Sequence, residues 1–222
     1  MSINNTSIIK LITIPTAITL AITLLRLIGE LNNWTPFLFS KQAGGGGALL
    51  GISWLPPIFG IWFAYKLIKA NETPETSSGR VILHAIGGIV LFAGGGALMA
   101  GQSPENFSPV KAFIGVLLFV AATAIQFPAW RKFFKTILAY GFAARVPVAI
   151  VMFIAIYGNW GTHYDVAPPN FPEMSWFNKY LLIGLMPQIL LWIPFTVLTG
   201  SLTAGITALV MQRGKATEAA EA

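Results

Sequence analysis

One arginine of this sequence lies inside a long apolar run. Arg145 belongs to the stretch AYGFAARVPVAIVMF and stands near the middle of that run, counted from either end. A charge at the centre of a bilayer costs about 2.5 kcal/mol or more, so it normally faces protein or a wet cavity and has a partner. Since none of the long apolar runs contains Asp or Glu, the groups that accept its hydrogens are the first functional question.

Three kinds of group can accept hydrogen bonds from this guanidinium. Prolines free the carbonyl four residues before them, and two runs contain prolines about half-way along: Pro56, Pro57 and Pro187. The polar side chains Ser53 and Gln188 have similar expected depths. A lipid phosphate or carboxylate, a quinone oxygen or a passing anion is the third kind. Arg145 is therefore either a structural tie between broken helices or a ligand-binding residue acting with Gln188 and Ser53.

A second group of reactive side chains lies in segment 158–175, which contains His163, Asp165 and Glu173 among aromatic residues and prolines. His163 and Asp165 are typical of a base and the group that orients it. Asp165 and Glu173 have oxygens that suit a cation. The alternative is a stiff loop whose aromatic side chains form an interfacial belt. No nucleophile or zinc motif accompanies these residues.

The sequence predicts no resident metal or cofactor. It has no cysteine, and its two histidines are His84 and His163. His84 lies one turn inside an apolar run, at the opposite side of the bilayer from His163, so the two cannot share a haem or metal. His84 alone is more typical of a packing residue, although ligation with a methionine or water stays open. A bound lipid or quinone also stays open.

The composition indicates that these residues are positioned in a membrane. Of 222 residues 55% are hydrophobic and 10% are charged, and mean hydropathy is +0.70, against roughly 45–50% apolar and about 25% charged in soluble domains. Water-soluble enzymes, nucleic-acid-binding domains and disordered proteins are therefore poor interpretations. Six runs are long enough to cross about 30 Å of hydrocarbon as helices. They are approximately 8–28, 48–68, 81–100, 112–129, 136–157 and 176–211.

The predicted fold is all-α: an integral membrane bundle of six transmembrane helices in a single domain, residues 1–222, with proline kinks in helices 2, 5 and 6. Small residues allow helix backbones to approach closely in lipid. The last run carries such a ridge at Gly200, Ala204 and Ala208, which suits another helix of this bundle or of a partner protein. The glycine run 44–47 is more typical of close packing than of a pore-lining loop.

The basic residues orient the bundle. Nine of them fall on one side of the predicted bilayer, and four, Arg26, Lys41, Lys111 and Lys179, fall on the other. The nine are Lys10, Lys66, Lys69, Arg80, Arg131, Lys132, Lys135, Arg213 and Lys215. The positive-inside rule makes the first side cytoplasmic, which predicts both termini inside and is typical of a bacterial inner membrane. Most of the formal net charge of +6 is thus explained by the orientation of the bundle in the membrane.

Three hypotheses about function follow. The first is a non-catalytic membrane subunit or scaffold that packs against another membrane protein or a second copy, because the spans are poor in ionisable groups. The alternative is a binding or conducting protein for an anionic or amphipathic small molecule, such as a lipid, quinone or anion, held near Arg145. The third is a membrane enzyme that uses segment 158–175. Membrane lipids are expected partners and nucleic acid is not. Ion-coupled transport is disfavoured because the spans lack buried carboxylates.

Overall fold

The computed structural model describes residues 6–100, 102, 106–169 and 171–221, and the side chains of 215–221, including Lys215, lie outside the described set. The fold is all-helical, with 75% of the chain in helices and no strand among the described residues. The elements are α1 (Ile8–Leu31), α2 (Pro36–Phe39), the 3-10 turn η1 (Ala43–Gly45), α3 (Leu55–Lys69), α4 (Ser78–Met99), α5 (Pro109–Ala124), α6 (Arg131–Gly158), α7 (Trp176–Lys179), the π-helical segments η3 (Tyr180–Leu185) and η4 (Gln188–Trp192), and α8 (Ile193–Glu221).

Four helical stretches are long and apolar enough to cross a membrane: α1, α4, α6 and the continuous stretch Trp176–Gly214. The all-α prediction and the prediction of membrane-compatible helices are thereby confirmed. The other two expected spans correspond to α3 with 15 residues and α5 with 16. At 1.5 Å per residue each is about 23 Å long, which is less than a hydrocarbon core of about 30 Å.

The second expected span differs most from the structure. Its helix begins only at Leu55, so residues 48–54 are not helical. Pro56 and Pro57 occupy the first turn of α3, where proline is tolerated because first-turn N–H groups have no partner inside the helix. The predicted kink half-way along this helix is therefore wrong, because the prolines start the helix.

The other prolines have different settings. Pro147 lies inside α6, whose helical assignment continues through it. Pro187 lies between the π-helical segments η3 and η4, where its missing N–H removes a backbone hydrogen bond. Single π-helical turns inside longer helices are frequent at functional sites.

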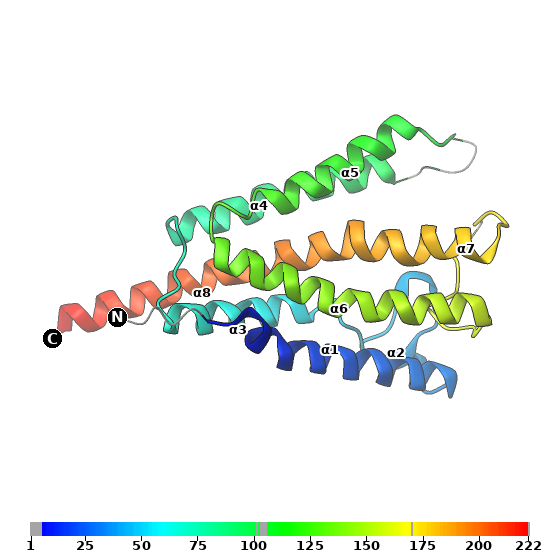
Figure 1. The fold of residues 1–222 in the computed structure, drawn as a ribbon, viewed down its shortest axis with the longest axis horizontal. Coiled ribbons are helices and arrows are strands. Elements are labelled where there is room, and N and C mark those ends of the chain that lie inside the picture. Colours follow the sequence, from blue (N-terminus) through cyan, green and yellow to red (C-terminus); the bar gives the residue numbers. More distant parts are fainter. Residues whose placement is uncertain (1–5, 101, 103–105, 170, 222) are drawn as a thin grey trace.

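The helices run side by side along the long axis of the molecule (Figure 1). The end at which α8 finishes is called the termini end here, and the opposite end, where α2 and α7 lie, is called the loop end. The hairpin of α4 and α5 diverges from the remaining helices toward the loop end (Figure 1). Segments 32–54 and 159–175 cover that end of the bundle.

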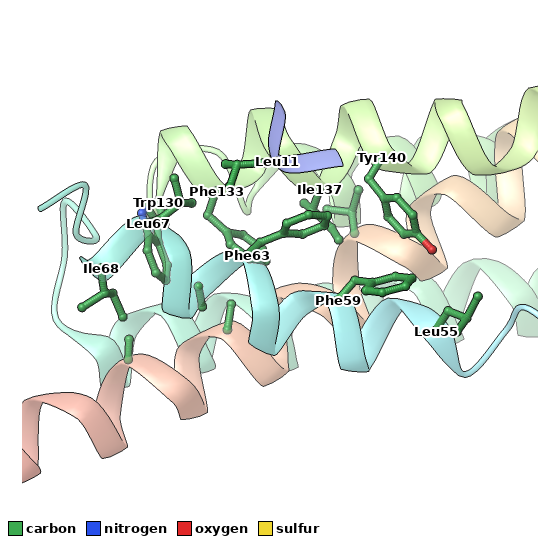
Figure 2. Packing of buried hydrophobic residues seen from close by; sticks show 14 of the residues in the cluster. Leu11, Leu55, Phe59, Phe63, Leu67, Ile68, Trp130, Phe133, Ile137 and Tyr140 are labelled. Carbon is green, nitrogen blue, oxygen red and sulfur yellow. The ribbon is translucent and has the colours of Figure 1, made fainter. Parts of the chain in front are cut away.

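The core lies toward the termini end, where α3 packs against α6 and α8 (Figure 2). Phe63 and Leu67 of α3 are fully buried. The Tyr140 ring of α6 makes edge-on contacts with Phe59 at 5.3 Å and with Phe63 at 5.7 Å between centroids. Burying an aromatic side chain contributes about 1.5–3 kcal/mol, so this cluster fixes how the three helices meet.

Small residues let α8 approach its neighbours within the chain. A Cβ added at Gly60 of α3 would lie 2.5 Å from the carbonyl oxygen of Gly200. Ala204 and Ala208, on the same ridge as Gly200, are fully buried in the core. The ridge that suggested a partner helix is thus covered by helices of this bundle.

Candidate functional site

A cavity of about 620 Å³ lies in the half of the bundle nearest the loop end. Its wall is formed by α1, α6, the π-helical stretch of 180–192 and the two covering segments, with Met99 and Gln102 at the end of α4. Most of its lining is apolar, including Ile22, Ile52, Val148, Met152, Leu182 and Ile183. The sequence-predicted binding residues Arg145, Gln188 and Ser53 all line this one cavity.

Arg145 projects from α6 and is 5% exposed. Its guanidinium carbon lies 4.7 Å from the centroid of the Trp192 ring, a cation–π contact. Its Nε is buried without a hydrogen-bond partner, and its side chain has no hydrogen bond or ion pair with any described residue. The carbonyls of Ile52, Ser53 and Ile183 therefore do not hold this side chain.

Gln188 and Ser53 differ in their surroundings. Gln188 is 6% exposed, its Nε2 lies 3.5 Å from the sulfur of Met152, and its Oε1 is buried without a partner. Ser53 belongs to the non-helical segment before α3 and is exposed at the rim of the cavity. Two of the four buried polar side-chain atoms that lack a partner among the described residues, Arg145 Nε and Gln188 Oε1, thus belong to cavity-lining residues.

A buried ionic cluster forms the loop-end wall of the cavity. Arg26 Nε donates to Glu30 Oε1 at 2.8 Å, and the Glu30 side chain is completely buried. The Nη2 of Arg26 donates to the carbonyl oxygens of Ser40 and Gly45. Glu30 also accepts from the backbone N–H of His163 at 2.8 Å and bonds to its Nδ1. The cluster thereby ties both covering segments to α1.

The environment of the histidine follows from this cluster. Burial holds the pKa of His163 below its ordinary value, against the opposing effect of its hydrogen bond to Glu30. The imidazole is therefore neutral at pH 7. Its ring lies 3.8 Å from that of Tyr164, and burial raises the pKa of the Tyr164 hydroxyl. That hydroxyl donates to the carbonyl oxygen of Thr23 on α1 at 3.1 Å.

The acidic residues of segment 158–175 do not form the expected sites. Asp165 accepts hydrogen bonds from the backbone N–H groups of Gly161 and Thr162 and from the Thr162 hydroxyl, so its carboxylate closes its own turn. The histidine is oriented by Glu30, and the predicted pairing with Asp165 is replaced. Glu173 is exposed outside the cavity lining. Among the described residues no three His, Asp or Glu side chains gather as metal ligands would.

His84 lies outside the cavity lining, on α4. Its Nδ1 is buried without a partner, and its carbonyl oxygen accepts from Gln126 Nε2 at 2.8 Å. That bond joins α4 to the end of the α5 segment.

The cavity has a net positive character. Its ionisable lining residues among the described part of the chain are Arg26, Arg145, His163 and Tyr164. Glu30 neutralises Arg26, and His163 and Tyr164 are uncharged, so one positive charge remains on Arg145.

In comparisons with known proteins, no protein-family model matches this chain, and no curated protein or solved structure shows significant similarity to it.

Proposed function

We propose that this protein is an integral membrane protein that binds an anionic, amphipathic small molecule in the 620 Å³ cavity. The acid group of the ligand lies against Arg145 and Gln188, and its apolar part lies along Val148 and Met152. The observation that carries this proposal is the buried guanidinium of Arg145, which has no hydrogen-bond partner among the described residues and lines this cavity.

The energetics support an anion. Leaving a buried charge unpaired costs several kcal/mol, and a carboxylate or phosphate would remove that cost through charge-assisted hydrogen bonds. The cation–π contact with Trp192 restrains the guanidinium, whose N–H groups have no partner among the described residues and can make a bidentate contact with an acid group. The free Oε1 of Gln188 can accept a hydrogen from a hydroxyl on the same head group.

The volume and lining of the cavity support an organic ligand. Sites for small molecules are typically of about 300–1,000 Å³, with apolar walls and a few polar groups that fix orientation. The packed core toward the termini end, with Phe63, Leu67 and Ile137 fully buried, favours binding over conduction because it fills the path from the cavity to that end.

The same features support a six-span arrangement. Non-helical backbone is tolerated at membrane depth where it lines a cavity, and Gly51, Ile52 and Ser53 before α3 do so. With α3 and α5 counted as crossings, nine basic residues lie on one side and four on the other, and this asymmetry favours an orientation with both termini in the cytoplasm. A bacterial inner membrane is the compartment that this charge pattern suits.

Ligand binding ranks before a scaffold role for a specific reason. The ridge at Gly200, Ala204 and Ala208 was the sequence feature that favoured a partner helix, and it is filled by α3 and α6. A stoichiometric membrane partner that survives mild extraction would restore the scaffold hypothesis.

The decisive experiment measures binding of decanoate and decyl phosphate to the purified protein in a non-ionic detergent by isothermal titration calorimetry. Arg145→Gln removes the charge in the cavity, and Arg80→Gln makes the same change at an exposed arginine of α4. We expect at least tenfold weaker binding in Arg145→Gln, because a charge-assisted hydrogen bond contributes about 1.5–3 kcal/mol. Arg80→Gln should bind like the wild type. Equal affinity in all three proteins, or no binding by the wild type, would reject the proposal.

A further inference from the structure

The loop-end part of the same cavity contains a second polar site. Arg26 and His163 both line the cavity and meet at Gly45. A Cβ added at Gly45 would lie 3.0 Å from His163 Cδ2 and 3.3 Å from Arg26 Nη1, and one at Gly51 would lie 3.4 Å from the same Nη1. Two glycines thus lie close against a guanidinium edge and an imidazole edge, and all four residues line the cavity.

Each of these edges has one unused hydrogen-bonding atom. The Nε and Nη2 of Arg26 are bonded to Glu30, Ser40 and Gly45, whereas Nη1 has no hydrogen bond to a described residue. His163 Nδ1 is bonded to Glu30, and its Nε2 likewise has no partner among the described residues. A carboxylate only accepts, so the ring hydrogen lies on Nδ1 and Nε2 is an acceptor.

A donor and an acceptor that share one space match a hydroxyl group, which accepts one hydrogen bond and donates another. A carboxylate or phosphate fits less well, because it would be repelled by the lone pair of Nε2 and by Glu30 behind it. The Arg26 charge is already neutralised by Glu30. This site therefore differs in kind from the uncompensated cation at Arg145.

The two polar sites lie at different depths. Tyr164, the neighbour of His163, packs in a cluster with Val148, Met152, Ala155 and Ile156 of α6. The middle of that set lies about two helical turns beyond Arg145, roughly 10 Å along the bundle. Apolar residues such as Val148, Met152 and Ile183 line the cavity between the two sites.

We propose that Arg26 and His163 form a hydroxyl-binding subsite, so that the ligand is an elongated amphipathic acid with its acid group on Arg145 and a hydroxyl group at its other end. This inference rests on the proposed function, because it requires that the acid group binds at Arg145. It adds the chemical class of the ligand and a role for the ionic cluster at the loop end.

The test compares three probes of each chain length in detergent solution: an unsubstituted fatty acid, its ω-hydroxy derivative and its ω-methoxy derivative, from octanoate to dodecanoate. At the best length the wild type should bind the hydroxy acid about tenfold more tightly than the other two, since a methyl ether cannot donate to His163. Equal affinity for all three at every length, or equal affinity for hydroxy and methoxy acids, would overturn the inference.

Two variants test whether the preference for the hydroxy acid depends on the proposed subsite. His163→Phe keeps an aromatic ring beside Tyr164 and removes the acceptor. Gly51→Ala places a methyl group 3.4 Å from Arg26 Nη1, where the hydroxyl would bind, and Gly96→Ala is its control because a Cβ there has no neighbour within 4 Å. Both test variants should lose the tenfold preference and still bind the unsubstituted acid, whereas Gly96→Ala should keep it. If His163→Phe does not fold, Gly51→Ala alone decides, and a preference that survives in it contradicts the subsite.

Arg145→Gln separates the two proposals. This substitution should weaken the binding of the hydroxy acid and of the unsubstituted acid by the same factor, because it removes the partner of the acid group that both probes carry. Binding of acids that depends on Arg145 without any gain from a hydroxyl would reject the subsite alone. Absence of binding by every probe would reject both the subsite and the proposed function.

Discussion

The two halves of this bundle are built from similar apolar helices but differ in how closely these helices pack. Toward the termini end, Phe63, Leu67 and Ile137 have no exposed surface, and α3, α6 and α8 pack against one another. Toward the loop end, α1, α6 and the π-helical stretch diverge around about 620 Å³ that contains a buried, unpartnered arginine nitrogen.

Polar side chains at the core and at the cavity differ in the same way. In the packed half, Thr136 donates to the carbonyl oxygen four residues earlier and Thr203 donates to that of Pro57, so their hydroxyls cost little. At the cavity, Arg145 and Gln188 keep unused atoms, while the other two unpartnered buried atoms among the described residues, Thr16 Oγ1 and His84 Nδ1, lie on α1 and α4 outside its lining. Because this chain packs one half densely, the cavity in the other half is not explained by a general inability of its side chains to pack. Departures from complete packing and hydrogen bonding are expected where a protein binds something.

Truncation of a core residue should have the largest effect on stability. Phe63→Ala removes a fully buried ring and should lower the free energy of unfolding by about 3–5 kcal/mol. Val148→Ala, on the cavity wall, should cost only about 1.5 kcal/mol because its methyl groups border an existing space. Denaturant titration in one detergent measures both. Equal losses would mean that the two halves do not differ in packing.

Removal of the buried carboxylate of Glu30 should cause the second-largest loss of stability. Glu30→Gln leaves the Arg26 charge buried without its partner and weakens both bonds to His163, so the free energy of unfolding should fall by about 3 kcal/mol. Glu173→Gln makes the same change at an exposed position of the loop end and should stay within about 0.5 kcal/mol of the wild type. A Glu30 variant as stable as the Glu173 control would show that the ionic cluster does not hold the covering segments in place.

The long helices were the easier part to predict from sequence. The expected spans 8–28, 81–100 and 136–157 fall within two or three residues of α1 and α4 and inside α6, because long apolar runs have few alternatives to helix in lipid. The second span was mispredicted because proline inside an apolar run signals either a kink or a helix start. Local sequence does not decide between these.

The cavity was predictable only in part. Arg145 is conspicuous as a charge within an apolar run, and depth alone grouped it with Gln188 and Ser53. The cation–π contact with Trp192 and the bonds between Glu30 and His163 were missed, because the latter join residues 133 positions apart. The one available signal was the spacing of Arg26 and Glu30, four residues apart on a helix. Asp165 was misassigned because its carboxylate is occupied by its own turn, which the spacing to His163 does not reveal.

The central arginine should oppose stability in the absence of ligand. Arg145→Met replaces an unpaired buried charge by an apolar chain of similar length, so the unligated protein should gain up to about 2 kcal/mol in free energy of unfolding. A saturating fatty acid should stabilise the wild type, by about 2.7 kcal/mol at a hundred times its Kd, and should not stabilise the variant. Arg80→Met, at an exposed site, serves as the control. A loss of stability in Arg145→Met comparable to that of Phe63→Ala would place this arginine with the core.

The smallest expected effect is on the pH dependence of stability. The folded pKa of His163 lies below its ordinary value of 6.5, so the unfolded chain binds the proton more readily, and stability should fall as pH drops below about 6.5. The facing charges are Arg26 and Glu30 on α1 and Asp165 in its own segment, and the neutral ring fits among them because Arg26 already neutralises Glu30. The loss, at most about 1.4 kcal/mol per pH unit, should be seen in denaturant titrations between pH 7.5 and 5.5. His163→Phe should remove this component from the profile. If His163→Phe keeps the wild-type dependence of stability on pH, another group titrates, and protonation of the imidazole does not destabilise the loop half.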